Sequence, residues 1–358
     1  VLVDVQEAAR LRFEMGPGYG TLDGLRGVFK ATWANINGTA RRLTLYTKVS
    51  RRFAKSVKPD ETVFTNPKTV PFVQSRVSIE YFEPSFLNFP VDGRLNYTFS
   101  KEEQSRFGEE NSFTASLDYR WTRHWIFTTS YQLAFSDPFN IRTANLQPGD
   151  ADPKRLTNVG EVVLIDYLND SFNPTRGSRT RLEADLYDAR LGGEENFWST
   201  NGRQELFVPI WVFRKGRQIG LGLNLGAGFS ESYRPSMEVP LEKRSEIGGE
   251  TTVRGFGQSA INPFTKNGLP QIGGNSYFFF QTELNIPIAG GVDLLGFFDG
   301  GNAYLKNKDF KPWDLRYGAG PGIRWNTPVG PLKIGYGFVL GPRDDEPAGH
   351  LFIGVGAI

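Results

Sequence analysis

Alternation of apolar and polar residues recurs along almost the whole chain, and it constrains the fold more than any other feature. In "NSFTASLDYRW" the apolar side chains occupy every second position. Side chains of a β-strand point alternately to the two faces of a sheet, so a period of two predicts strands with one apolar face. The apolar face carries Phe113, Ala115, Leu117, Tyr119 and Trp121, and the polar face carries Thr114, Ser116, Asp118 and Arg120.

The same pattern recurs in "TRLEADLY" and in "SYFFFQTELNI". About sixteen such segments follow one another, with no convincing helix between them. An even number of this size is typical of bacterial outer-membrane barrels. The predicted strands are 10–20, 25–34, 42–54, 72–83, 92–106, 110–121, 125–136, 155–168, 178–190, 196–211, 217–231, 274–288, 292–304, 314–327, 330–340 and 348–358.

A soluble β-sandwich is the alternative, because its sheets also have one apolar face. A soluble sheet of this size would normally split into domains or recruit helices, and no segment marks a domain boundary. No stretch of about 18 consecutive apolar residues is present, so a spanning helix is not expected. The 41 glycines and the aromatic content of 14% agree with lipid-facing strands. We therefore predict an all-β fold, a transmembrane antiparallel β-barrel of about 16 strands with a long inward-folded loop.

Connection lengths alternate, as they do in a barrel with short turns at one rim and long loops at the other. Residues 213–218 and 326–332 are predicted to be tight turns, because glycine or proline interrupts them. Residues 233–273 instead form a loop of roughly forty residues, a length that is uncommon and usually functional. This loop contains "GGETTVRGFGQSAINPF", in which the cation Arg254 precedes Gly255 and Phe256.

Two carboxylates on later strands are candidate partners for Arg254. If Leu294 and Phe298 face lipid, alternation directs Asp299 into the lumen, and Glu283 on the preceding strand points the same way. A barrel of this size encloses enough space to admit a loop, so Arg254 is able to reach both carboxylates. The alternative is that Arg254 is a solvated loop charge and that Asp299 is a lumen charge of the kind found in porins.

Several motifs together resemble the BamA/TamA superfamily of outer-membrane assembly factors. The loop has "VRGF", formed by Val253, Arg254, Gly255 and Phe256, and "FFDGGNAY" is similar to the family's F-x-D-x-G strand. "GAGPGIRWNTPVGPLKIGYGF", "NPTRGSRTRLEADL" and "EMGPGYGTLDGLRGVFKATWANING" resemble other segments of the same barrel. The resemblance covers essentially the whole chain.

This resemblance implies a role for the loop and a domain division. The VRGF residues would anchor the loop in the barrel, and Arg254 would contact carboxylates of the twelfth and thirteenth strands. Residues 1–9 would be the remnant of a preceding periplasmic POTRA domain, and residues 10–358 the outer-membrane barrel. The implied lumen partners are Glu283, Phe297, Asp299 and Gly301.

The resemblance also implies the function, which is insertion or translocation of β-barrel or surface proteins without covalent chemistry, so that no enzyme activity is expected. Partners would be unfolded outer-membrane or secreted clients, outer-membrane lipid, and periplasmic or lipoprotein accessory subunits. A secretion transporter of the same superfamily, which passes its client through the lumen, and a passive porin remain alternatives. The seam between the first and last strands would be the gate, with Phe13, Gly16, Gly18, Gly20, Phe352, Gly354 and Gly356.

Catalytic, metal and cofactor sites are not expected. The two histidines, His124 and His350, lie far apart without a second ligand pattern, and no G-x-S-x-G nucleophile motif occurs. No cysteine is present, which excludes disulfides and thiolate metal sites within this sequence. The net charge of +2 without a basic cluster gives no basis for nucleic-acid binding.

Overall fold

A computed structural model gives the structure of the protein. The predicted remnant at residues 1–9 lies outside the described residues except for residue 9, and Gly356 also lies outside them. The structure describes residues 9–20, 24–51, 64–65, 73–103, 107–139, 141–142, 146, 149–171, 173–213, 217–264, 271–327, 330–344 and 346–355.

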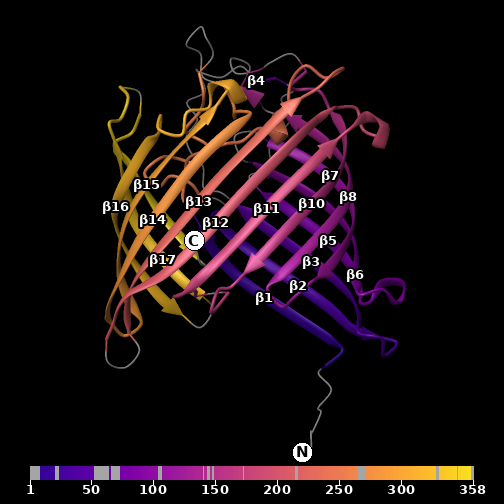
Figure 1. Cartoon of the computed structure of the whole chain (residues 1–358), viewed down its shortest axis with the longest axis horizontal. Coiled ribbons are helices and arrows are strands. Elements are labelled where there is room, and N and C mark those ends of the chain that lie inside the picture. Colours follow the sequence, from indigo (N-terminus) through magenta and orange to yellow (C-terminus); the bar gives the residue numbers. More distant parts are fainter. Residues whose placement is uncertain are drawn as a thin grey trace, which may run out of the picture.

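Sixteen antiparallel strands form one sheet that follows chain order around a barrel wall (Figure 1). The predicted fold class is therefore confirmed. A separate two-stranded sheet pairs β4 (Phe64–Thr65) with β9 (Ile141–Arg142). The strands of the wall are β1 (Leu11–Gly20), β2 (Gly24–Ile36), β3 (Arg41–Arg51), β5 (Gln74–Glu83), β6 (Val91–Glu103), β7 (Phe107–Arg120), β8 (Trp125–Phe139), β10 (Lys154–Asp166), β11 (Gly177–Tyr187), β12 (Phe197–Val212), β13 (Gln218–Ser232), β14 (Ser276–Ala289), β15 (Val292–Tyr304), β16 (Arg316–Thr327), β17 (Gly330–Leu340) and β18 (Gly349–Val355).

The two faces of the strands differ as the alternation predicts. On β7, Phe113 and Leu117 are exposed on the outer face, whereas Ser112 and Asp118 are buried. On β15, Leu294 and Phe298 are exposed, whereas Asp299 is completely buried. Apolar side chains thus cover the outside of the barrel, and polar side chains line its interior.

Connections at the two ends of the barrel differ in length. The end where β1 begins carries short turns such as 37–40, 121–124 and 290–291, and we call it the short-turn end. The opposite, long-loop end carries 233–275 and 305–315. The helices of the described residues are short 3-10 turns, none long or apolar enough to cross a membrane.

Several predicted strand ends differ from the observed ones by one to three residues, and one of them has a clear local cause. The strand predicted at 178–190 ends at Tyr187, because the Asp188 side chain accepts a hydrogen bond from the backbone of Arg190 and caps a 3-10 turn there. Such local side-chain bonds compete with strand pairing, which alternation alone does not detect.

The sheet has one seam. The sixteen strands of the wall pair with one another in chain order, but the described residues of β1 and β18 lie side by side without a hydrogen-bonded ladder between them. The barrel is therefore nearly closed, with an unsealed join between its first and last strands.

Candidate functional site

The long loop between β13 and β14 is folded. It contains the 3-10 turn Leu241–Lys243, and isolated bridges join Ser245 to Gly274 and Ile247 to Ile261. A tight turn follows, in which the backbone nitrogen of Gly249 donates to the carbonyl of Val253 at 3.2 Å. Gly249 adopts a positive φ of 99°, which a residue with a side chain rarely adopts, so glycine permits this turn. The turn presents the VRGF residues to the barrel wall.

Arg254 contacts both predicted carboxylates. Its Nε and Nη2 atoms donate to the two oxygens of Asp299 at 2.7 and 2.8 Å, and its backbone nitrogen donates to the same side chain at 3.0 Å. Its Nη1 atom donates to Glu283 at 2.8 Å. Arg254 is 3% exposed and both carboxylates are completely buried. The planar guanidinium, with its fixed set of donors, is able to serve both carboxylates at once.

Strand register places these carboxylates next to each other. Glu283 on β14 lies opposite Phe297 on β15, so Asp299 lies two residues further along the same face. Diagonal neighbours of this kind have Cα atoms about 7–8 Å apart, which leaves room for a guanidinium between them. The Phe297 ring lies beside the guanidinium, with its centroid 4.1 Å from the Arg254 Cζ atom.

Burial opposes the charge on Arg254, but hydrogen bonds and charge attraction to Asp299 and Glu283 outweigh burial and raise the pKa of the guanidinium above its ordinary value. Arg254 therefore stays charged inside the barrel. Replacing it with a neutral residue would leave two buried carboxylates short of a partner, which is costly.

Two further cations contact Glu283, and the sequence analysis missed both. Lys333 on β17 donates to the Glu283 oxygens at 2.9 and 3.1 Å, and Arg324 on β16 lies 3.9 Å from one of them. Alternation could have found both residues, because Ile323 and Ile334 beside them are exposed on the outer face. The site thus holds three cations around two carboxylates.

Glycines of the wall let the loop backbone lie directly against the strands. A β-carbon on Gly318 of β16 would collide with the carbonyl of Arg254, and one on Gly337 of β17 would collide with the backbone of Gly255. Gly255 itself has a φ of 101°. On β15, a β-carbon at Gly301 would lie 2.8 Å from the side chain of Val253. These glycines provide the space in which the loop is seated.

Apolar packing surrounds the arginine. Val253 is completely buried and Phe256 is 5% exposed. Both belong to one cluster that joins the loop to the inner face of three strands. Its members are Ile247, Val253, Phe256, Ile261, Phe279, Ala303 and Val339.

A second buried arginine fixes the loop elsewhere. Arg244 donates to both oxygens of Asp150 at 2.9 and 2.7 Å, and to the carbonyl of Val239 at 3.0 Å. Asp150 lies in the connection between β9 and β10. No sequence signal could have paired these residues, because neither lies on a strand whose alternation would orient it.

The predicted seam residues lie on different faces. Phe13 of β1 is 64% exposed on the outside, whereas Phe352 of β18 is 5% exposed and points inward. The Phe352 ring packs edge-on against Phe297 at 5.4 Å. Gly354 of β18 borders the loop, because a β-carbon there would collide with the Glu250 carboxylate. The remaining described seam residues are the β1 glycines Gly16, Gly18 and Gly20.

The described residues hold no cluster of three or more histidine, cysteine, aspartate or glutamate side chains arranged for a metal. His124 stacks on Tyr167 at the short-turn end, with ring centroids 4.3 Å apart. His350 lies near Gly257 of the loop.

Comparison with known proteins agrees with this geometry. The family that matches residues 35–357 is described as the Omp85 superfamily domain. The outer membrane protein assembly factor BamA of Nitratidesulfovibrio vulgaris is 27% identical over 196 residues, which cover 51% of this chain and 23% of that protein. The chain therefore spans less than a quarter of that relative's length.

Solved structures share the fold. BamA from Haemophilus ducreyi lacking POTRA domains 1-3 superposes with a TM-score of 0.77 at 18% identity, and the match covers 98% of this chain and 71% of that one. CdiB from Acinetobacter baumannii gives a TM-score of 0.59 at 15% identity, covering 98% and 61%. At these identities the matches establish the fold alone.

Proposed function

This chain belongs to the Omp85 superfamily and is a barrel of the bacterial outer membrane, and from this premise we propose that it inserts or translocates client proteins through the seam between β1 and β18. The clients are β-barrel or surface proteins that arrive unfolded. The short-turn end faces the periplasm, and residues 1–9 are the remnant of a preceding periplasmic POTRA domain. Periplasmic or lipoprotein subunits deliver the client.

The unsealed seam is the observation that carries this proposal. An unfinished client strand has backbone N–H and C=O groups without hydrogen-bond partners. Placing each such group in hydrocarbon costs roughly several kcal/mol of free energy. The facing edges of β1 and β18 present the same groups. A client strand that pairs with either edge satisfies both sets by β-augmentation.

The position of the loop favours a lateral client route through the seam and not a route through a wide channel in the lumen. It occupies the interior next to the seam, and its Arg254 guanidinium lies 5.9 Å from the centroid of the inward-facing Phe352 ring on β18. The last strand is thus packed against the loop on its inner face, while the described residues of its edge toward β1 form no ladder. Such an edge can accept a client strand without disturbing the loop.

The proposal is tested by locking the seam in the full-length protein in its native host. The sequence has no cysteine, so an introduced cysteine pair meets no native thiol of this sequence with which it could form another disulfide. The lock joins outward-facing positions near the long-loop ends of the two strands, Tyr19→Cys with Leu351→Cys. The matched control joins Leu351→Cys to Tyr336→Cys, which lie directly opposite each other in the β17–β18 ladder.

We expect the oxidised lock to stop the assembly of newly made outer-membrane barrels, scored by heat-modifiable migration, and reduction to restore it. The control disulfide should leave assembly unchanged. A locked barrel that is folded and still supports client assembly would overturn the lateral route and favour passage through the lumen. Steady, large conductance of the unmodified barrel would instead favour a passive porin.

A further inference from the structure

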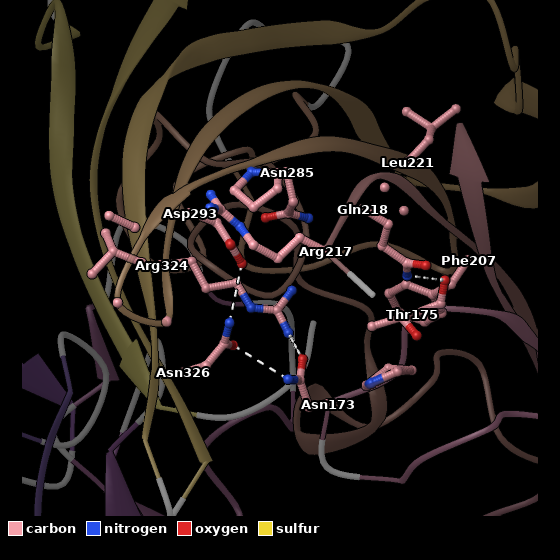
Figure 2. Close-up of a pocket in the computed structure, with 18 residues that line it drawn as sticks. Asn173, Thr175, Phe207, Arg217, Gln218, Leu221, Asn285, Asp293, Arg324 and Asn326 are labelled. Carbon is pink, nitrogen blue, oxygen red and sulfur yellow. Dashed lines mark hydrogen bonds between the residues drawn. The ribbon is translucent and has the colours of Figure 1, made fainter. Parts of the chain in front are cut away.

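The connection between β10 and β11, described at residues 167–171 and 173–176, reaches across the short-turn end of the lumen. Asn173 at its tip donates to the side chain of Asn326 at 3.3 Å and accepts a hydrogen bond from Arg324, both on β16. Four strands, β12 to β15, separate β11 from β16 along the wall. This connection therefore joins two distant parts of the barrel rim, and we call it the strap. Figure 2 shows Asn173 between Arg324 and Asn326.

The strap is a preformed unit. The Asn169 side chain accepts from the backbone nitrogens of Thr175 and Arg176 at 3.0 and 2.9 Å. The Asn169 backbone nitrogen donates to the Arg176 carbonyl at 3.1 Å. The side-chain amide of Gln218, at the start of β13, donates a hydrogen bond to the Thr175 carbonyl at 3.2 Å. The strap therefore keeps its own conformation when its tip is released, because its internal bonds do not depend on β16.

Arg324 connects the tip of the strap to the loop anchor. Its Nη2 atom donates to Asn173, and its Nη1 atom lies 3.9 Å from Glu283. Glu283 in turn accepts from Arg254 at 2.8 Å. A continuous set of polar contacts thus runs from the long loop to the strap.

Arg324 also has room to move. A cavity of about 240 Å³ lies between the strap and the wall, and Arg324, Asn173 and Asn326 line it (Figure 2). Arg324 is only 5% exposed, and its Nε atom has no hydrogen-bond partner among the described residues. The guanidinium is therefore held from its two ends, by Glu283 and by Asn173, and the adjoining space lets it swing when either contact is lost.

We propose that the strap closes the periplasmic mouth of the lumen and that Glu283, through Arg324, couples the strap to the Arg254 anchor. Release of the loop shifts the Glu283 carboxylate and weakens the hold of Arg324 on Asn173. By thermodynamic linkage, release of the strap must loosen the anchor by the same factor. The conformation of the long loop at one end of the barrel then changes together with the position of the strap at the other end.

Amide hydrogen exchange of the full-length protein in lipid nanodiscs tests the coupling without any client, so its outcome is independent of the proposed insertion function. In Arg254→Ala and in Glu283→Gln we expect exchange of residues 167–176 to accelerate on the order of fivefold or more. The turn at 37–40, at the same end of the barrel, serves as the internal reference and should not change. Arg244→Ala is the matched control, because it frees the same loop at a contact that does not involve Glu283.

Unchanged exchange of residues 167–176 in a folded Arg254→Ala barrel would overturn the proposal, as would equal acceleration in Arg244→Ala. If Arg254→Ala does not fold, the reciprocal variant decides. Asn173→Ala removes one amide at the barrel rim and should accelerate exchange of residues 248–264. A loop as protected in that variant as in the parent would overturn the coupling.

Discussion

Two arginines of the same loop are buried and ion-paired at equal distances, yet they do different things. Arg254 and Arg244 each have a carboxylate partner at 2.7 Å, and both are less than 10% exposed. Arg254 contacts Asp299 and Glu283 on two strands of the wall, whereas Arg244 contacts Asp150 in another loop.

From this difference we expect that burial and pairing do not by themselves make an anchor. An ion pair fixes a loop to the barrel only when its partner belongs to the hydrogen-bonded wall, whose register holds the carboxylate in place. A pair between two loops holds them to each other, and both can move together. The predictions below separate these two cases through the local opening free energy of residues 253–257, measured by hydrogen exchange.

Arg254→Ala should have the largest effect. It leaves Asp299 buried without its cation, so the opening free energy of residues 253–257 should fall by about 3–5 kcal/mol. Arg254→Lys should recover only part of this loss, because an ammonium group cannot bridge two carboxylates with a planar fork. A double-mutant cycle with Asp299→Asn checks the pairing, and strictly additive effects would show that the two residues do not interact.

Gly318→Ala should come next. Its β-carbon would strike the backbone carbonyl of Arg254, which cannot swing aside as a flexible side chain can. We expect a loss of about 1–3 kcal/mol in the same opening free energy, from overpacking alone. Gly16→Ala is the matched control, because no atom lies within 4 Å of its added β-carbon. Equal protection of the loop in both variants would mean that the loop does not rest on β16.

Lys333→Met should weaken the anchor less. Glu283 would lose one cation but keep Arg254 at 2.8 Å and Arg324 at 3.9 Å. The lysine's own burial cost disappears with its charge, so the expected loss at residues 253–257 is about 1 kcal/mol. A loss as large as that of Arg254→Ala would make Lys333 an equal member of the anchor.

Arg244→Ala should have the smallest effect at this segment. Exchange should accelerate near residues 239–245, where the partner contacts lie. At residues 253–257 the opening free energy should change by less than about 0.5 kcal/mol, because distant sites without shared partners act independently. A larger change would show that the two arginines form one unit and would remove the distinction drawn between them.

Sequence alternation predicted most of the anchor. It placed Glu283 and Asp299 on the inner face of adjacent strands, and the VRGF motif supplied Arg254. Arg324 and Lys333 were missed, and although alternation could have oriented both inward, orientation does not reveal which of many lumen charges meet. The strap tip Asn173 and the Arg244–Asp150 pair lie in connections without periodicity, so nothing in the chain indicated their partners.

The sequence by itself determined the sixteen-stranded wall, its two faces and its short and long connections. These are local properties, because a side chain's direction on a strand depends only on its position in the alternation. The tertiary structure alone decided that three cations gather on Glu283, that Phe13 and Phe352 lie on opposite faces of the seam, and that the strap reaches β16. Those contacts depend on strand register and on the curvature that brings distant strands together, and both are set by the whole sheet.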